Sequence, residues 1–228
     1  MTQQIQVNRP RYFMGRLGMV FYITSIITLG WIGLWAGMGS AIWNMVLFTL
    51  SFGTIGFMML LAGGADFSWR PLTLSVLFPI GAGIAIIATL SVFILTIPPL
   101  QAPITLPALS LTQLMIPLYG FIGVQEEMFW SGIHIFIRSH IGGIKVLVGL
   151  LAFSAFGFAA FHEPVAQQLF GGGITLMPGF FFWLAGSAVM YRLAVEVFHH
   201  VGVGMGIHFG WNVFVTYLHQ TYFTSGGF

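Results

Sequence analysis

Residues 112–137 read TQLMIPLYGFIGVQEEMFWSGIHIFI, an apolar stretch that contains two adjacent glutamates, Glu126 and Glu127. A helix needs about 20 mostly apolar residues to cross the hydrocarbon layer of a bilayer, and this stretch is long enough. Stretches of the same character fill most of the 228-residue chain, which is 57% hydrophobic with a mean hydropathy of +0.95. Only 5% of its residues are charged, against roughly 25% in a soluble domain. The composition excludes a water-soluble fold and predicts an all-α, polytopic membrane protein.

The composition also excludes several kinds of site. The chain has no cysteine, which removes disulfides, thiolate metal sites, iron–sulfur clusters and cysteine nucleophiles. Its formal net charge of +2 is too small for a nucleic-acid-binding face. At this length we expect residues 1–228 to form a single transmembrane domain in contact with the lipid bilayer.

Seven segments are long and apolar enough for a transmembrane helix: 17–38, 41–63, 73–97, 112–137, 146–163, 175–197 and 201–219. Glycine and proline residues mark the breaks between them, as at Gly142-Gly143 and Pro98-Pro99. The apolar runs are long and unbroken, unlike the short alternating strands of a membrane β-barrel. We therefore expect a helical bundle of about seven spans.

The basic residues predict the orientation of this bundle. With the N-terminus in the cytoplasm, every Lys and Arg falls on or near the cytoplasmic side: Arg9, Arg11, Arg16, Arg70, Arg138, Lys145 and Arg192. Cytoplasmic loops are enriched in these two residue types. The pattern predicts a multi-pass protein with a cytoplasmic N-terminus, and a prokaryotic plasma membrane as its location.

Glu126 and Glu127 lie in the middle of the predicted span 112–137. Ionisable groups inside a membrane are costly, so each one is a candidate functional residue. The nearest basic residue in the same helix, Arg138, lies about 18 Å further along it. Two carboxylates in a dry site do not readily both ionise, so we expect one to be poised as a base and the other to stay neutral. That arrangement suits acid–base catalysis.

Three polar residues on other predicted helices are able to join this pair. His162 ends the span 146–163, and His208 and Asn212 are four residues apart in the span 201–219, so both lie on one helix face. Each alone has a purely structural explanation, since such residues often hydrogen-bond a neighbouring helix. Together with the glutamates they form a candidate site.

The remaining polar residues predict less. We expect Asp66, Glu163 and Glu196 to be solvated or interfacial charges. We expect His134 to be a packing or interfacial residue, with support of the glutamate pair as the alternative. The glycine-rich run 202–206 predicts close helix packing, because no strand precedes it as in a phosphate-binding loop.

These motifs resemble those of the CPBP family, the CAAX-prenyl-protein endopeptidases and their bacterial and archaeal relatives, some linked to bacteriocin processing or immunity. The family pattern is Glu-Glu-x-x-x-Arg, then Phe-x-x-x-His, then His-x-x-x-Asn or Asp, on separate helices. Here Glu126-Glu127, Phe158-x-x-x-His162 and His208-x-x-x-Asn212 follow that order. The resemblance covers a core of about residues 112–215. Ser131 stands at the position of the family arginine, and we expect no Arg or Lys nearby to replace it.

The resemblance implies an intramembrane endopeptidase that acts on a membrane-associated peptide or protein. Glu126 with His162 would activate a water, His208 and Asn212 would donate hydrogen bonds to the developing oxyanion, and Glu127 would be an orienting or protonated partner. Glu126, His162 and His208 also have the side chains of a zinc site with an open position for water. The sequence leaves glutamate-only and zinc-assisted hydrolysis open.

Other functions remain compatible with the residues. Ser131 and the scarcity of charge favour a non-catalytic subunit or assembly factor with this fold in a larger membrane complex. Buried histidines are able to ligate haem or chlorophyll, and buried carboxylates relay protons in transporters. A retinal protein is disfavoured, because its Schiff base needs a lysine within a helix. The only lysine, Lys145, lies at a predicted span end.

Overall fold

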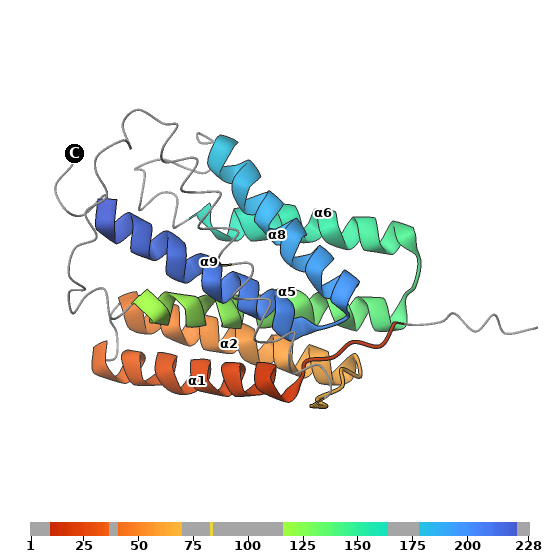
Figure 1. The fold of residues 1–228 in the computed structure, drawn as a ribbon, viewed down its shortest axis with the longest axis horizontal. Coiled ribbons are helices and arrows are strands. Elements are labelled where there is room, and N and C mark those ends of the chain that lie inside the picture. Colours follow the sequence, from red (N-terminus) through yellow and green to blue (C-terminus); the bar gives the residue numbers. More distant parts are fainter. Residues whose placement is uncertain (1–9, 37–40, 70–82, 84–115, 164–177, 223–228) are drawn as a thin grey trace, which may run out of the picture.

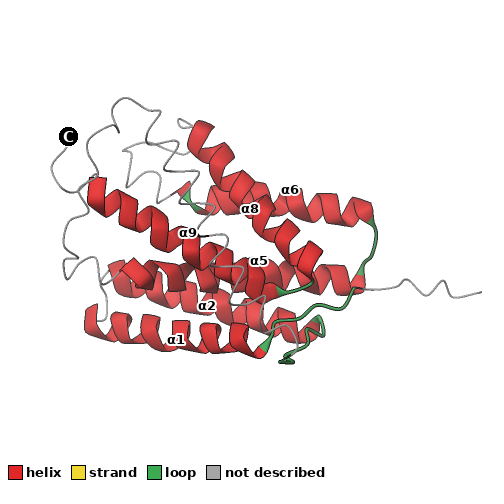
Figure 2. Ribbon diagram, in the orientation of Figure 1, coloured by secondary structure: helices red, strands yellow, loops and turns green. Residues whose placement is uncertain are grey.

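The computed structural model describes residues 10–36, 41–69, 83, 116–163 and 178–222. These parts of the chain form six helices and, beyond two isolated bridges, no β-structure (Figures 1 and 2). The helices are α1 (Arg16–Ala36), α2 (Ala41–Ala62), α5 (Ile116–His140), α6 (Ile144–Phe161), α8 (Pro178–Phe198) and α9 (Val201–Tyr222). They correspond, within a few residues, to six of the seven predicted segments. The seventh, 73–97, lies outside the described residues apart from Gly83.

Three of the described helices are long and apolar enough to cross a membrane: Arg16–Leu34, Ile144–Phe161 and Phe181–Phe198. The part of α2 from Val46 to Ala62 is apolar as well. Large apolar side chains on these helices point outward, and Trp31, Phe156 and Val197 are each more than 60% exposed. Soluble monomers rarely expose apolar surface of this extent. The all-helical fold and these apolar faces indicate a membrane protein.

Helix α5 is the centre of the bundle. In Figure 1, α1, α2 and α5 run beside one another, while α9 and α8 cross them obliquely. α5 packs most extensively against α2 and α9, whereas α8 packs chiefly against α6 and α9. Side chains of α5 enter both apolar cores, Met128 with α1, α2 and α9, and Trp130 with α6, α8 and α9. Polar residues of α5 are thereby held inside the bundle.

Two glycines let α2 and α5 approach closely. A Cβ atom placed on Gly132 would lie 2.4 Å from the backbone oxygen of Gly56, and a Cβ on Gly56 would lie 2.3 Å from the backbone oxygen of Met128. Small residues allow this kind of close packing between membrane helices. Since the obstructing atoms are backbone, neither contact can be relieved by a side-chain rotation.

Gly132→Ala should therefore destabilise the protein, because α2 and α5 must move apart. We expect a loss of about 1–3 kcal/mol of unfolding free energy, measured by thermal unfolding in detergent. Gly149→Ala is the matched control, since Gly149 lies in α6 with no atom within 4 Å of an added Cβ. Alanine has the higher helix propensity, so the control should be neutral or stabilising by up to about 1 kcal/mol. Equal effects of the two substitutions would contradict the close approach.

The N-terminal segment closes one end of the bundle. The backbone N–H of Phe13 donates to His199 O at 2.7 Å, and that of Val201 donates to Phe13 O at 2.7 Å. On the other side, Met14 N–H donates to Asp66 O at 2.8 Å, and Asp66 N–H to Tyr12 O at 2.8 Å. Residues 12–14 thus join the loop after α2 to the turn between α8 and α9.

His200 lies in this turn, fully buried, and should make stability depend on pH. Burial lowers the pKa of His200 to about 4 from its usual 6.5. Below about pH 6.5 the unfolded chain binds a proton at this imidazole, whereas the folded chain does so only near pH 4. As the pH is lowered from about 6.5 to about 4, the unfolding free energy should therefore fall by up to about 3 kcal/mol. Thermal unfolding of the wild type and His200→Gln across this range checks it, and identical pH slopes would contradict it.

Candidate active site

Glu126 and Glu127 point to different neighbours because successive residues of a helix are rotated by about 100°. Glu127 is fully buried and Glu126 is 8% exposed. Glu126 faces side chains from α6 and α9, whereas Glu127 faces α8 and α9. The two carboxylates therefore share His208 as a neighbour but otherwise face different side chains.

One oxygen of Glu126 faces two histidines. Its Oε2 lies 3.9 Å from His162 Nε2 and 3.6 Å from His208 Nε2. This buried oxygen accepts no hydrogen bond from the part of the chain that the structure describes. Three helices far apart in sequence thus bring a carboxylate and two imidazoles to one place.

His162 is fixed by the end of α6. It caps the helix after Phe161, and its Nδ1–H donates to Phe158 O at 2.8 Å, one turn back. Because Nδ1 carries the proton of the neutral ring in this bond, Nε2 has the lone pair and points toward Glu126. Glu126 lies about 21 Å before the α5–α6 turn and His162 about 27 Å after it, so the antiparallel helices bring them to a similar level.

His208 lies between the two glutamates. Its Nδ1 is 3.7 Å from Glu127 Oε2, while its Nε2 faces Glu126. The ring is stacked on Tyr191 of α8, with centroids 4.7 Å apart, and meets the edge of Phe158 at 5.5 Å. These aromatic contacts orient the imidazole. No sequence motif indicated Tyr191.

Asn212 lies one helical turn beyond His208 and does not contact the carboxylates. Its Nδ2 donates to the backbone oxygen of Tyr119 at 3.2 Å. Gly123 makes room for both α9 side chains, since a Cβ there would lie 2.7 Å from Asn212 Nδ2 and 2.8 Å from His208 Cδ2. The structure brings four of the five predicted site residues together and places Asn212 at their edge.

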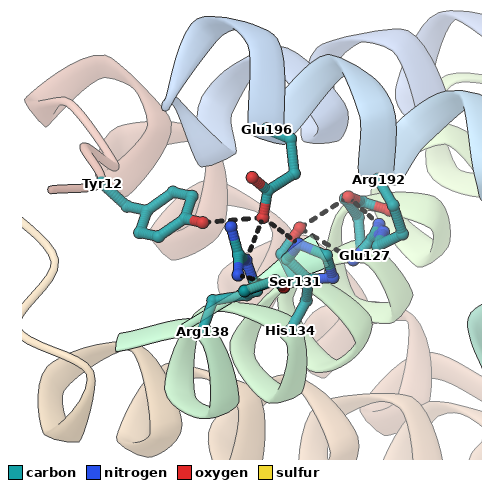
Figure 3. Close-up of polar contacts among 8 residues, drawn as sticks. Tyr12, Glu127, Ser131, His134, Arg138, Arg192 and Glu196 are labelled. Carbon is teal, nitrogen blue, oxygen red and sulfur yellow. Dashed lines mark hydrogen bonds and ion pairs between the residues drawn. The ribbon is translucent and has the colours of Figure 1, made fainter. Parts of the chain in front are cut away.

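Arg192 of α8 pairs with Glu127, which corrects the expectation that no basic side chain lies near Ser131. Its guanidinium forms an ion pair with Glu127 Oε1 and donates to Ser131 Oγ at 2.9 Å, while the Ser131 hydroxyl donates to Glu127 Oε1 at 2.7 Å (Figure 3). All three side chains are buried. Arg192 lies in another helix, far from Ser131 in the sequence, so the sequence did not indicate that these two side chains meet.

A second polar cluster forms around Glu196 of α8. Its Oε1 accepts hydrogen bonds from Tyr12 OH at 2.7 Å, His134 Nε2 at 2.6 Å and Arg138 Nε at 3.0 Å (Figure 3). The Glu196 side chain is only 11% exposed and His134 is fully buried. The expectation of a solvated Glu196 is therefore wrong. His134 is packed inside the bundle, one of the two alternatives expected for it, and there it hydrogen-bonds Glu196.

The described side chains do not form the zinc site that the sequence left open. Within the described ranges, no group of three or more His, Asp or Glu side chains is arranged to hold a metal ion. This finding includes Glu126, His162 and His208, the predicted zinc set.

Comparisons with protein-family models, curated proteins and solved structures found no match to this chain.

Proposed function

We propose that this chain is an intramembrane endopeptidase of the CPBP type, which hydrolyses a peptide bond in a membrane-associated substrate. The observation that supports it most is the meeting of Glu126 Oε2 with the Nε2 atoms of His162 and His208 at 3.9 and 3.6 Å. A carboxylate beside two imidazoles is suited to bind a water and move its protons.

In this mechanism Glu126 takes a proton from the water while the water oxygen adds to the substrate carbonyl carbon. The lone pair on His162 Nε2 orients the same water. His208 donates a hydrogen bond to the oxyanion, and Asn212 is the second donor if substrate displaces it from Tyr119. Glu126 then passes its proton to the leaving amine as the C–N bond breaks, which gives a carboxylic acid and an amine.

Glu127 has a different task in this proposal. A buried carboxylate needs a compensating charge, and Arg192 supplies it while Ser131 holds the same oxygen. Glu127 then stays ionised and fixed, and Glu126 is left to exchange the proton. Gly204 keeps space for this arrangement, since a Cβ there would lie 2.5 Å from Glu127 Oε1.

For the topology, we propose seven spans with a cytoplasmic N-terminus in a prokaryotic plasma membrane. In support, the N-terminal segment, the end of α2, the end of α5 and the α8–α9 turn lie at one end of the bundle (Figure 1). Arg11, Arg16 and Arg138 lie at that end. α5 begins at the opposite end from the one where α2 ends. This is what we expect if the segment 73–97 crosses the membrane between these two helices.

The experiment that tests this function needs no known substrate. Membrane proteins from cells with and without the chain are compared by sequencing all their N-termini. The proposal expects new internal N-termini that appear only with the chain and persist when a chelator is added to isolated membranes. Loss with chelator would favour zinc-assisted hydrolysis. If no N-terminus depends on the chain and it co-purifies with a larger complex, the non-catalytic alternative is favoured.

A further inference from the structure

Two facing stripes of polar side chains join α5 to α8. On α5 the polar residues recur every three or four positions, so they lie on one face of the helix. On α8, Arg192 and Glu196 are four residues apart and also share a face. We call the set the polar ladder: Glu127, Ser131, His134, Arg138, Arg192 and Glu196.

The ladder has two rungs. The inner rung joins Arg192 to Glu127 and Ser131, and the outer rung joins Glu196 to His134 and Arg138 (Figure 3). α8 contacts α5 less extensively than it contacts α6 or α9. Polar contacts therefore have a large share in fixing where α8 lies along α5.

The two rungs are linked through α8, which carries Arg192 of the inner rung and Glu196 of the outer rung. Arg192 and Glu196 are about 6 Å apart along one helix axis, so a turn or slide of α8 moves both side chains together. Arg192 is 1% exposed. If α8 moved, Arg192 would leave Glu127 as a buried carboxylate without its cation, a state that costs several kcal/mol and favours protonation.

The N-terminal segment ties into the outer rung. Tyr12 is buried and gives Glu196 its third hydrogen bond, and the same segment holds the turn between α8 and α9. Burial and the bond to Glu196 raise the pKa of Tyr12 well above its usual value, so the phenol stays a donor at physiological pH. His199 in that turn has φ 50°, the left-handed region that few non-glycine residues adopt. The segment thus helps hold a turn that joins the helices of Arg192 and His208.

We propose that Glu196 is a positioning residue for the glutamate pair: it holds α8 where Arg192 reaches Glu127, and Tyr12 brings the N-terminal segment into this arrangement. Glu196 touches neither glutamate and acts through Arg192. The inference rests on the proposed function only for the catalytic importance it gives to Glu127.

Infrared spectroscopy tests this proposal without a substrate, because a carboxylate and a protonated carboxyl absorb at different frequencies. The full chain is reconstituted in lipid, and the Glu127 band is assigned by difference from Glu127→Gln. We expect an ionised Glu127 in the wild type, and a protonated carboxyl in Glu196→Ala. Asp66→Ala is the matched control, since Asp66 lies at the same end with an exposed side chain, and it should leave the band unchanged.

A Glu127 band that stays ionised in folded Glu196→Ala would overturn the proposal. If that variant does not fold, Tyr12→Phe decides, because it removes a single hydroxyl. It should protonate a measurable fraction of Glu127, and an unchanged band in it would equally overturn the proposal. Cleavage is read separately, with an expected fall of about 100-fold in Glu196→Ala. If the Glu127 band shifts in Glu196→Ala but the wild-type chain cleaves no substrate, the result would support the polar ladder and contradict the proposed function.

Discussion

Glu126→Gln is expected to lower the appearance of chain-dependent N-termini by about 100- to 10,000-fold, the range that a general acid–base group contributes. Glutamine keeps the shape of the side chain but cannot accept the proton of the attacking water. The fold should be retained, because Glu126 Oε2 makes no hydrogen bond to the described residues. The measurement is quantitative N-terminal sequencing of membranes with equal amounts of each variant.

Asp66→Asn is the matched control for this substitution. It makes the same change of carboxyl to amide in an exposed side chain whose backbone, rather than its carboxyl, pairs with residues 12 and 14. It should cleave as the wild type does. Wild-type cleavage by Glu126→Gln would remove Glu126 from the mechanism.

Arg192→Ser should nearly abolish cleavage and lower stability, and moving the arginine to position 131 should reverse much of both effects. The single variant leaves Glu127 buried without its cation, which costs about 3–5 kcal/mol when one partner of a buried pair is removed. Ser131 is one turn from Glu127 on the same helix, and its Oγ lies 2.7 Å from Glu127 Oε1. An arginine at 131 is therefore within reach of the carboxylate. The double variant Ser131→Arg with Arg192→Ser should recover most of the stability and part of the cleavage.

Thermal unfolding in detergent and N-terminal sequencing measure the two effects of the relocation. Arg11→Ser is the control for loss of an arginine, since Arg11 is exposed, and it should change neither quantity. A double variant as impaired as Arg192→Ser would show that the charge beside Glu127 is not what Arg192 contributes.

The helices were predictable because membrane helices leave a strong signal in sequence. Long apolar runs broken by glycine and proline located six described helices to within a few residues. Among the described residues, three helices meet the length and composition of a membrane crossing. In α5 the adjacent Glu126 and Glu127 interrupt the apolar run, so hydropathy alone is a weaker signal for this helix.

The meeting of Glu126 with His162 and His208 followed from a physical rule, that ionisable groups inside a membrane converge on one another. Asn212 shares a face with His208, yet its amide bonds a backbone oxygen of α5 instead. Helical spacing predicts the face of a residue and not its partner. For that reason the position of Asn212 was predicted less well than those of His162 and His208.

The positions of Arg192 and Glu196 along the chain do not indicate the side chains that they contact. A signal was available: Glu127, Ser131, His134 and Arg138 share one helical face, and a polar stripe inside a bundle requires a polar stripe opposite. Arg192 and Glu196, four residues apart, are such a stripe. Sequence alone did not say that α8 lies against α5, since that depends on tertiary packing.

Cleavage in ¹⁸O-labelled water reveals whether water bound at Glu126 adds to a peptide carbonyl. A purified membrane substrate, identified from the chain-dependent N-termini, is incubated with the reconstituted protein and its products are weighed by mass spectrometry. Hydrolysis by this water predicts one ¹⁸O atom in the new C-terminal carboxyl group, and cleavage by Glu126→Gln that is slower by about 100- to 10,000-fold. Product formed without the label, or formed at the wild-type rate by Glu126→Gln, would contradict it.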